Sequence, residues 1–589
     1  MPEIVIDGKK IEAEKGSTVL ATALENGIDI PHFCWHPELS ISGNCRMCLV
    51  EVGLPKRLPD GDFEKDENNE PIINYFPKLQ IACATFVADG MHIRTKSEKA
   101  IDAQESVMEF LLINHPLDCP ICDEAGECKL QEYAFRHSRG ESSFEEAKNR
   151  AMKRVSWGPN VMFDGERCIS CSRCIRFAQE IARQDVLTFV NRGDHVTIEL
   201  FEGKVFDSPY SMNVIDICPV GALTSKDFRF KARVWDMSFN DSISPCDSTG
   251  SNIKLGIRNN EILRIDPRPN KYVNGYWITD ETRLKGYKFV NENRVLEPEI
   301  KGEGGVSWED AYIKAAELMK KYKPEEIMVL GSPKATNEDN YILKKFASEV
   351  LKTPNLGYLE HIDDSTEEDD MLIVKDKAPN TAGVKAIGLV PGENGIKADD
   401  LEENIKSGKI KALYVMEEDL EYHQQIIKVL DNLDLLIVHA YNHSELTEKA
   451  DVLIATSTYA EIEGTYTNRD KRVQHFQPCL VTNENRRVMG MKLSRLDKFG
   501  SFNDRWTQHE IRNCRQSWRS IMNIANLMGA KWEYKKTEHV FDELAESIDS
   551  FKDMNYDKLI DHKGLVMDKG DNPDPVLWHY VSHYMTPSH

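Results

Sequence analysis

The chain has 589 residues, 14 cysteines and a formal net charge of −23 at pH 7. This length suffices for about three to five domains, and the negative charge disfavours a nucleic-acid partner because it would repel the phosphate backbone. The mean hydropathy is −0.48 and no long apolar run is present, which excludes a membrane-spanning helix.

The N-terminal sequence predicts the start of a small folded domain. MPEIVIDGKK contains neither an apolar signal region nor an Arg- and Ser-rich transit peptide, so we expect a soluble protein of the bacterial cytoplasm. Apolar residues on either side of the Asp7-Gly8 turn predict a β-hairpin over residues 4–13. Ser17 is the expected N-cap of a helix that runs to Leu24. A hairpin followed by a helix is the usual start of a β-grasp ferredoxin.

A first group of cysteines follows this segment. It consists of Cys34, Cys45, Cys48 and Cys83. Four thiolates suffice for a [2Fe–2S] cluster, whose ligands typically include one Cys-x2-Cys pair and one distant cysteine. Gly43 lets the backbone turn so that its amides face the sulfides. The acidic stretch over residues 52–80 predicts a solvent-exposed loop, and docking of a partner is the alternative function for it.

A second group contains one histidine and three cysteines. An apolar face over residues 101–113 predicts a helix that ends before Pro116. The group follows at H-x3-C-x2-C-x5-C and consists of His115, Cys119, Cys122 and Cys128. An imidazole and three thiolates complete the coordination of a [4Fe–4S] cluster. Gly126, within the five-residue gap, allows the backbone to reverse and return Cys128 to the cluster.

A third group begins with the pattern C-x2-C-x2-C. Its members are Cys168, Cys171, Cys174 and Cys218, the last of which precedes a proline. This is the pattern of bacterial ferredoxins, in which the remote cysteine often serves another cluster. Only one remote Cys-Pro is present here, so the simplest interpretation is a single [4Fe–4S] cluster. We expect a helix over residues 176–182 and a strand over residues 196–200 to pack around it.

Two other uses of these cysteines are possible. Disulfides suit small secreted domains, whereas this chain is large and shows no export signal. Zinc needs sets of four ligands at C-x2–4-C…C-x2–4-C spacing, and none of the three groups has this form. A zinc-stabilised scaffold is the non-redox alternative, and electron paramagnetic resonance (EPR) of the reduced protein would test it because zinc gives no signal.

The C-terminal half predicts a parallel α/β sheet. Short apolar runs alternate with helical stretches at residues 326–330, 412–416, 435–439 and 452–455. Ser307 is the expected N-cap of one helix. The glycines of KGEGGVS predict a linker rather than a nucleotide cradle, and HIDDSTEEDD predicts a solvated loop. The remaining thiols are expected to be isolated and buried: Cys246, Cys479 and Cys514. The C-terminal tail predicts either a disordered end or a strap along a partner.

Four motifs in the first 235 residues carry a resemblance to a known family. They are HFCWHPELSISGNCRMCLVEV, INHPLDCPICDEAGECKLQ, RCISCSRCIRF and IDICPVGALT. In this order they resemble the large iron–sulfur subunit of respiratory complex I, the proton-pumping NADH:quinone oxidoreductase. The resemblance implies a multidomain α+β and α/β chain. Its expected domains are a β-grasp [2Fe–2S] ferredoxin domain at 1–100, a [4Fe–4S] domain with one histidine and three cysteine ligands at 101–150, a bacterial-ferredoxin-like [4Fe–4S] domain at 151–235 and a molybdopterin-oxidoreductase-like α/β domain at 236–589.

The C-terminal domain resembles molybdopterin oxidoreductases through ARVWDM, WITDETR and ADVLIATSTYAEIEGTYTNRDKRVQ. Catalytic members often open this domain with a cluster motif, of which only Cys246 remains here. No cysteine lies between Cys246 and Cys479, and Ser365 and Thr366 sit in an acidic run that would repel a pterin phosphate. We therefore expect the fold without molybdopterin, without a fourth cluster and without a catalytic site of its own.

The resemblance implies an electron-transfer subunit that works within a larger complex. No flavin or NAD phosphate loop is visible, so hydride chemistry is expected on a partner, an FMN- and NADH-binding flavoprotein subunit. Electrons would enter at the Cys34 group, pass to the Cys168 group and leave through the His115 group to quinone-side iron–sulfur subunits. The complex would lie on the cytoplasmic face of the bacterial inner membrane, with its membrane arm contacted indirectly. The alternative is the large subunit of an NAD-linked formate dehydrogenase or hydrogenase-type complex, which molybdenum or tungsten analysis would distinguish.

Overall fold

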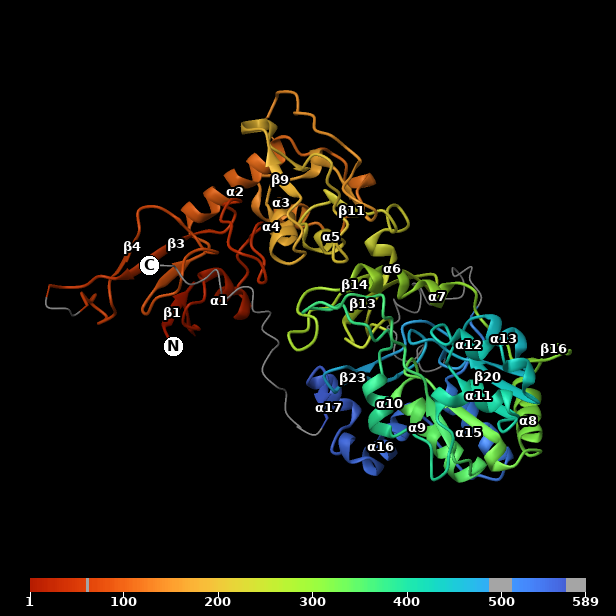
Figure 1. Ribbon diagram of the computed structural model, residues 1–589. Helices are drawn as coiled ribbons and strands as arrows, with labels where there is room; N and C mark the ends of the chain where they lie inside the picture. Colours follow the sequence, from red (N-terminus) through yellow and green to blue (C-terminus); the bar gives the residue numbers. More distant parts are fainter. Residues whose placement is uncertain (60–62, 143, 487–510, 568–589) are drawn as a thin grey trace. The chain divides into compact units, whose positions relative to one another are not determined.

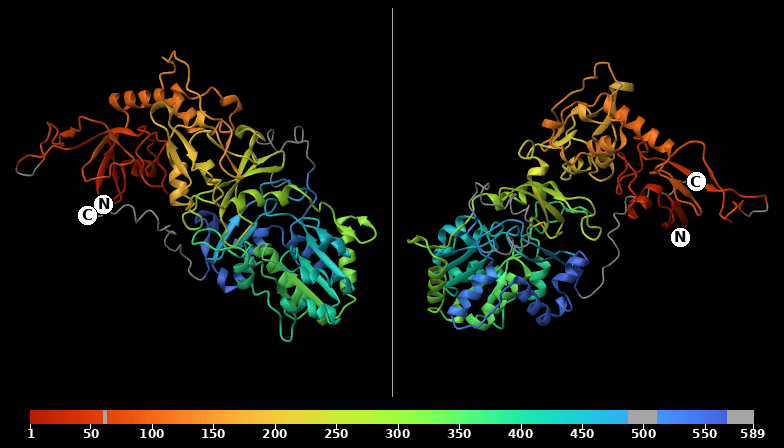
Figure 2. Two further views of the ribbon diagram at one scale, coloured as in Figure 1. Left: turned by 45° about the horizontal axis from the view of Figure 1, so that its top comes forward. Right: turned by 180° about the vertical axis from the view of Figure 1, so that it is seen from behind.

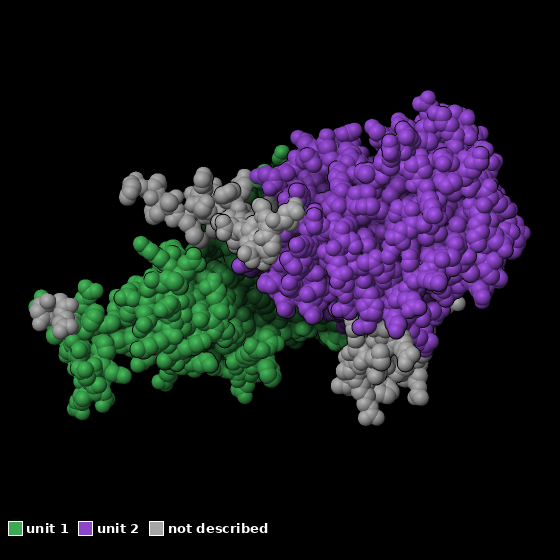
Figure 3. Space-filling view, turned by 90° about the horizontal axis from the view of Figure 1, so that it is seen from below, with its two compact units in different colours: residues 1–235, 579–589 green, residues 236–578 purple. Residues whose placement is uncertain are grey.

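The computed structural model describes residues 1–59, 63–142, 144–486 and 511–567. The chain divides into two compact units, which Figure 3 colours separately. Unit 1 comprises Met1–Trp235, and unit 2 comprises the described residues of Asp236–Trp578. No helix in the described ranges combines the length and apolar character needed to cross a lipid bilayer.

Unit 1 begins with a twisted mixed sheet and one short helix. The strands are β1 (Glu3–Ile6), β2 (Lys9–Glu12), β3 (Leu49–Pro55), β4 (Ile73–Tyr75), β5 (Gln80–Ile81) and β6 (His92–Arg94). Their order is β2-β1-β6-β3-β4, and β5 pairs with β3. The hairpin and the helix α1 (Val19–Glu25) agree with the sequence prediction, but the N-cap is Thr18 rather than Ser17. The Thr18 hydroxyl accepts a hydrogen bond from the Ala21 amide at 3.3 Å.

The stretch over residues 52–80 is not the irregular loop that we predicted. β3 and β4 pair as an antiparallel ladder in which Gly53 lies opposite Tyr75. Isolated bridges extend the pairing beyond the ladder, between Arg57 and Phe63 and between Lys65 and Pro71. The acidic composition indicated exposure, which is correct for most of these residues, but it hid a hairpin whose strands satisfy each other's backbone groups.

The rest of the described part of unit 1 is built from helices and two small sheets. The helices are α2 (Glu98–Ile113), α3 (Lys129–His137), α4 (Arg173–Glu180) and α5 (Asn213–Ile217). The strands are β7 (Val155–Ser156), β8 (Val161–Phe163), β9 (Leu187–Val190), β10 (Thr197–Leu200) and β11 (Leu223–Ser225). α2 is the long helix labelled in Figure 1. It begins three residues before the predicted start because Ser97 caps it, accepting a hydrogen bond from the Ala100 amide.

Unit 2 contains a seven-stranded sheet with the order β16-β15-β21-β20-β19-β17-β18. Its strands are β15 (Glu299–Ile300), β16 (Gly304–Gly305), β17 (Ile327–Gly331), β18 (Asn355–Tyr358), β19 (Ala412–Met416), β20 (Leu435–Ala440) and β21 (Val452–Ala455). β17 to β21 run parallel. Four of these strands correspond to the predicted apolar runs, whereas β18 was not predicted. The KGEGGVS segment is not a linker, because two of its glycines form β16, the antiparallel edge strand.

Both faces of this sheet are covered by helices (Figures 1 and 2). Alternate residues of one strand belong to different hydrophobic cores: Ala412, Tyr414 and Met416 to one, Leu413 and Val415 to the other. The first core also contains residues of α8 (Trp308–Met319), α9 (Asn337–Lys345), α15 (Ser517–Leu527) and α16 (Thr537–Ser547). The second contains residues of α11 (Leu401–Lys406), α12 (Gln424–Ile427) and α13 (Glu445–Lys449).

Two smaller sheets complete the described part of unit 2. One is the antiparallel meander β12 (Ser238–Ile243), β13 (Asn252–Arg258) and β14 (Glu261–Pro267). The other consists of β22 (Gly464–Thr467), β23 (Arg472–Phe476) and β24 (Leu565–Val566). The remaining short α-helices in that part are α6 (Asp280–Lys285), α7 (Lys288–Asn291), α10 (Thr381–Ile387) and α17 (Tyr556–Asp561). Cys479 and Cys514 are buried as predicted, whereas Cys246 is only half-buried. The predicted C-terminal strap lies outside the described residues.

Candidate iron–sulfur sites

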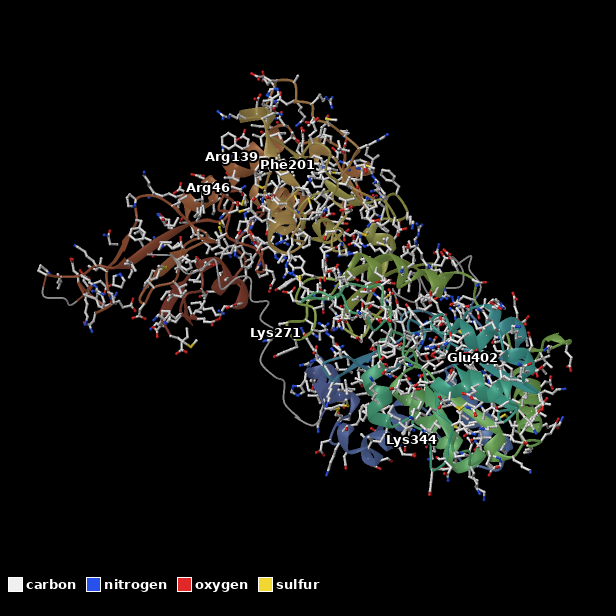
Figure 4. All side chains as sticks on the ribbon, viewed as in Figure 1. Arg46, Arg139, Phe201, Lys271, Lys344 and Glu402 are labelled. Carbon is white, nitrogen blue, oxygen red and sulfur yellow. The ribbon has the colours of Figure 1, made fainter. Side chains whose placement is uncertain are left out.

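The structure brings the four cysteines of the first group together. Cys45 and Cys48 lie just before β3, and Cys83 follows β5, so the sheet places them beside the Cys34 loop. Cys34 accepts side-chain hydrogen bonds from Cys45 and Cys83, and Cys48 accepts one from Cys83. Arg46, labelled in Figure 4, has φ 59° and Gly43 has φ 63°, so left-handed residues turn the chain between these cysteines.

The thiols of this group cannot all ionise together. Hydrogen bonds from Cys45 and Cys83 lower the pKa of Cys34, and a hydrogen bond from Cys83 lowers that of Cys48. The same bonds raise the pKa of the donors, Cys45 and Cys83. A cationic iron core fits this arrangement, because it would replace the shared protons and let all four sulfurs act as thiolates.

The third group lines a single cavity. Its four cysteines face this cavity together with the apolar side chains of Phe163, Ile198, Val220 and Leu223. Ser170 and Ser172 have φ values of 54° and 63°, and these two left-handed residues curl the chain so that Cys168, Cys171 and Cys174 converge. Cys218 lies at the end of α5, where it is the C-cap residue.

Burial controls the chemistry of these thiols. It raises the pKa of Cys168 to about 12 and holds that of Cys174 and Cys218 well above the ordinary value. Burial also raises the pKa of Cys171, although the nearby Arg173 guanidinium opposes it. Buried thiols with raised pKa values are unreactive alone. Binding of iron here would therefore release protons and be coupled to folding.

The second group follows the C-terminus of α2. Burial raises the pKa of Cys122 and of Cys128. The charge of Cys119 also raises the pKa of Cys122, and the charge of Cys122 raises that of Cys128. Burial, with the Arg167 guanidinium, lowers the pKa of His115 to about 4, so the imidazole is neutral and free to act as a ligand at pH 7. In the described part of the chain the His115 ring makes no hydrogen bond to the three thiols. Within this group, the three cysteines therefore interact with one another more than they interact with the histidine.

The segment that follows Cys218 joins the third group to the second. The carbonyl of Pro219 accepts a hydrogen bond from the Lys129 amide at 3.1 Å and lies 3.9 Å from Cys128 Sγ. A Cβ atom on Gly221 would lie 2.1 Å from Cys122 Sγ, so only glycine fits there. Arg167, which precedes Cys168, donates to Asp118 at 2.9 Å and to the Gly221 carbonyl at 3.5 Å.

Two buried arginines join the third group to the first. Arg176 donates to the carbonyl of Cys34 at 2.5 Å and also to that of Ser40. Arg173 donates to the carbonyl of Ile217 at 2.9 Å, next to Cys218, and to that of Trp35. Their exposed fractions are only 4% for Arg173 and 8% for Arg176. Because a buried charge needs specific partners, Arg173 and Arg176 act as positioning residues that hold these segments together.

Our sequence analysis missed these arginines. Both lie within the motif RCISCSRCIRF, which we used only for its cysteines. Basic residues beside thiolate ligands were a usable signal, because they offset negative charge. Three of their carbonyl partners, those of Cys34, Trp35 and Ser40, lie more than 130 positions away, which the sequence pattern does not reveal.

Comparison with known domain families locates the same segments. Residues 2–98 match a "2Fe-2S iron-sulfur cluster binding domain", and residues 104–143 match an "NADH-ubiquinone oxidoreductase-G iron-sulfur binding region". Residues 158–224 match the ferredoxin-like domain of "NADH-quinone oxidoreductase subunit 3". These matches confirm the predicted order of domains and the predicted iron–sulfur cofactors.

Two families match unit 2. Residues 359–488 match "Molybdopterin oxidoreductase", which confirms the predicted fold of this part. Residues 238–286 match an "NADH-ubiquinone oxidoreductase NDSU1/NuoG-like, 4Fe-4S domain". In this chain that stretch contains a single cysteine, Cys246, which is too few for a cluster ligand set.

Similar proteins confirm the resemblance seen in the four motifs. The G-type subunit of NADH-quinone oxidoreductase from Rickettsia bellii is 39% identical over 376 residues, covering 63% of this chain and 52% of that protein. The mitochondrial "NADH dehydrogenase [ubiquinone] iron-sulfur protein 1" of Solanum tuberosum is 42% identical over 352 residues, covering 59% of this chain and 45% of that protein. The chain thus spans about half the length of these relatives. A solved NAD+-reducing [NiFe]-hydrogenase chain is 28% identical over 40% of this chain and 91% of its own, with a TM-score of 0.32.

Proposed function

We propose that this chain is the large iron–sulfur subunit of an NADH:quinone oxidoreductase, and that unit 1 relays electrons within that complex. The matched iron–sulfur domains and the relatives named as NADH-quinone oxidoreductase and NADH dehydrogenase proteins support this proposal. The expected neighbours are an FMN- and NADH-binding flavoprotein subunit on one side and quinone-side iron–sulfur subunits of the peripheral arm on the other. The complex would stand on the cytoplasmic face of a bacterial inner membrane, with this chain reaching the membrane arm only indirectly.

The proposed ligand sets are the three groups described above. One [2Fe–2S] cluster is assigned to Cys34, Cys45, Cys48 and Cys83. One [4Fe–4S] cluster is assigned to His115, Cys119, Cys122 and Cys128, and another to Cys168, Cys171, Cys174 and Cys218. When bound, such clusters accept and pass on one electron at a time. We keep the four predicted domain ranges, 1–100, 101–150, 151–235 and 236–589, as part of the proposal.

One observation carries the proposal: the Cys168 group is connected directly to both of the others. Arg173 and Arg176 tie it to the Cys34 loop, and the segment from Pro219 to Gly221 touches Cys122 and Cys128. Electron tunnelling falls steeply with distance, so redox groups must be held close together. We therefore place the Cys168 group in the middle of the relay, with entry at the Cys34 group and exit through the His115 group.

The protein's own residues hold the spacing and adjust the charge at these sites. The two arginines fix the Cys34 loop against α4, and their positive charges favour the thiolate form of Cys171. The neutral His115 imidazole brings one negative charge fewer than a thiolate would, which shifts the potential of the site it serves. Unit 2 would act as a scaffold, and we propose no molybdopterin and no catalytic site of its own.

The test is EPR spectroscopy of the purified native complex, reduced with NADH and with dithionite. We expect signals from one [2Fe–2S] and two [4Fe–4S] clusters in this subunit. His115→Ala should alter one [4Fe–4S] signal and leave the [2Fe–2S] signal intact, because only the second group contains this residue. A protein without iron, or with zinc in place of iron, would overturn the proposal. Stoichiometric molybdenum or tungsten would instead favour a formate-dehydrogenase-type complex.

A further inference from the structure

The sheet of unit 2 has a topology that creates a ligand site in other proteins. Numbered along the chain, its parallel strands β17 to β21 lie in the order 2-1-3-4-5. β18 pairs with one edge of β17, and the next parallel strand in the chain, β19, pairs with the other edge of β17. At such a switch point the loops beyond the carboxyl ends of the two central strands separate, and ligands bind in the crevice between them.

A cavity lies at this switch point. Its volume is about 360 Å³, within the range of small-ligand sites. The loops that follow three central strands contribute charged and aromatic side chains to its wall: Lys334 after β17, Glu417, Glu418 and Asp419 after β19, and His439 and Tyr441 at the end of β20. This wall comes entirely from unit 2 and does not involve the iron–sulfur groups.

Three metal-ligating side chains converge beside the cavity. His361 follows β18, and Glu418 and Asp419 follow β19; one ligand atom from each lies within 4.8 Å of the others. The imidazole Nε2 of His361 and a carboxylate oxygen of Glu418 are 2.7 Å apart, and both side chains are fully buried. His361 opens the HIDDSTEEDD segment that we predicted to be solvated, so this part of the prediction is wrong. Asp419 is 38% exposed and leaves the triad open to solvent.

Two buried imidazole nitrogens at this place have no partner. His439 lines the cavity; its Nε2 is 2.6 Å from the Tyr414 hydroxyl, whereas its Nδ1 makes no hydrogen bond. His361 lies behind Glu418 rather than in the cavity wall; its Nδ1 atom is also without a partner, and both histidines have zero exposed area. Buried polar atoms are normally satisfied, so the unsatisfied Nδ1 of His439 at the cavity wall points to a missing ligand.

A cationic group already occupies part of the triad. The Lys334 ammonium lies 2.5 Å from a carboxylate oxygen of Asp419. One imidazole and two carboxylates suit borderline first-row metals, whereas Mg²⁺ and Ca²⁺ prefer oxygen ligands alone. We propose that this triad, at the edge of the cavity, binds a divalent first-row transition metal ion through His361, Glu418 and Asp419, with Lys334 holding the cation position when the metal is absent.

The experiment uses the full chain with its iron–sulfur clusters intact and oxidised, in which state they give no EPR signal. Surface metals are removed by dialysis against a chelator, and Mn²⁺ is titrated while the six-line EPR signal of free Mn²⁺ is recorded. We expect one strong site per chain. Glu418→Gln and Asp419→Asn should each weaken Mn²⁺ binding by about tenfold or more, since each removes a charged ligand.

Two further variants make the result decisive. Glu421→Gln is the matched control, because Glu421 lines the same cavity and loses the same charge but is not in the triad. It should change the affinity less than about threefold. Lys334→Met should strengthen binding, because it removes the competing ammonium. The proposal is overturned if neither the wild type nor Lys334→Met has a stoichiometric site, or if Glu421→Gln weakens binding as much as Glu418→Gln. Unchanged iron content in every variant verifies that unit 1 is intact.

Discussion

The two units of this chain are held together in different ways. The seven-stranded sheet of unit 2 is buried on both faces, and its alternate residues enter two hydrophobic cores. In unit 1 the sheet of the N-terminal domain has a compact apolar core, which includes the ligand candidates Cys48 and Cys83. The segments around the other two groups are helices, small sheets and loops, with buried apolar side chains such as Trp157, Phe177 and Phe206 among them. We therefore expect unit 2 to be stable through its hydrophobic cores alone, and the stability of unit 1 to depend more on metal bound by its thiols.

The first way to break this comparison is to remove the iron, and it has the largest expected effect. Chelation should abolish the protease resistance of residues 101–235, whose buried thiols would lose their metal, because metal binding there would supply folding free energy on the order of 10 kcal/mol. Residues 236–486 should keep their slow hydrogen exchange. Limited proteolysis and exchange, both read by mass spectrometry, measure the two effects. Equal loss of protection in both units would show that the units fold as one.

The second way is to damage unit 2 by a change that does not touch a thiol ligand. Glu461 is buried and pairs with Arg294 at 2.7 Å and with Arg512 at 2.9 Å. Glu461→Gln leaves two buried guanidinium groups without a counter-charge, which should cost about 3–5 kcal/mol. The denaturant midpoint of unit 2 should fall while the EPR signals of unit 1 persist. Asp431→Asn is the control, since its pair with Lys449 is exposed and its loss should cost less than about 1 kcal/mol.

The same carboxylate predicts the acid response of unit 2. Burial opposes its ionisation, but the charges of Arg294 and Arg512 outweigh burial and lower the pKa of Glu461 to about 2. The folded pKa is thus below the unfolded value of about 4.3, so the stabilisation is complete above that pH and is lost as the pH falls toward 2. Glu461→Gln should flatten the stability of unit 2 between these limits. An unchanged slope would mean that other carboxylates dominate.

The third way is to fill the space beside one thiol. A Cβ on Gly221 would lie 2.1 Å from Cys122 Sγ, so Gly221→Ala must displace one of the two chains. We expect one [4Fe–4S] signal to weaken or shift and unit 1 to lose about 1–3 kcal/mol by overpacking. In Gly392→Ala the nearest heavy atom would be 3.6 Å away, and this control should behave as the wild type. Two normal [4Fe–4S] signals in Gly221→Ala would contradict the contact.

The regular elements of unit 2 were predictable because their signal is local. The apolar runs at 412–416 and 452–455 coincide with β19 and β21, since a buried parallel strand needs only a short continuous apolar stretch. In unit 1 the cysteine spacing indicated three ligand groups, because cluster ligands leave a fixed pattern in the sequence. The choice between Ser17 and Thr18 as N-cap was not decidable, since adjacent hydroxyls offer the same hydrogen bond.

The features that we missed depend on partners far away in the sequence. The carbonyl partners of Arg176 and the Glu418 partner of His361 lie on other elements, and no periodicity encodes such pairs. The acidic composition of HIDDSTEEDD concealed a buried histidine at its first position, because composition averages over a segment while burial is decided residue by residue. Side chains that join elements are thus the part of a site that a single sequence reveals least.

The smallest expected effect comes from removing one helix N-cap in each unit. Thr18 caps α1 of unit 1, and Ser307 caps α8 of unit 2 by accepting a hydrogen bond from the Asp310 amide at 3.1 Å. Thr18→Ala and Ser307→Ala should each cost about 1 kcal/mol, the usual value of a lost N-cap. In the iron-loaded protein each variant should shift only the unfolding transition of its own unit. Hydrogen exchange measures both transitions. If Thr18→Ala shifts the transition of unit 2, the two units share one cooperative unfolding event, and the distinction between a metal-held and a core-held unit fails.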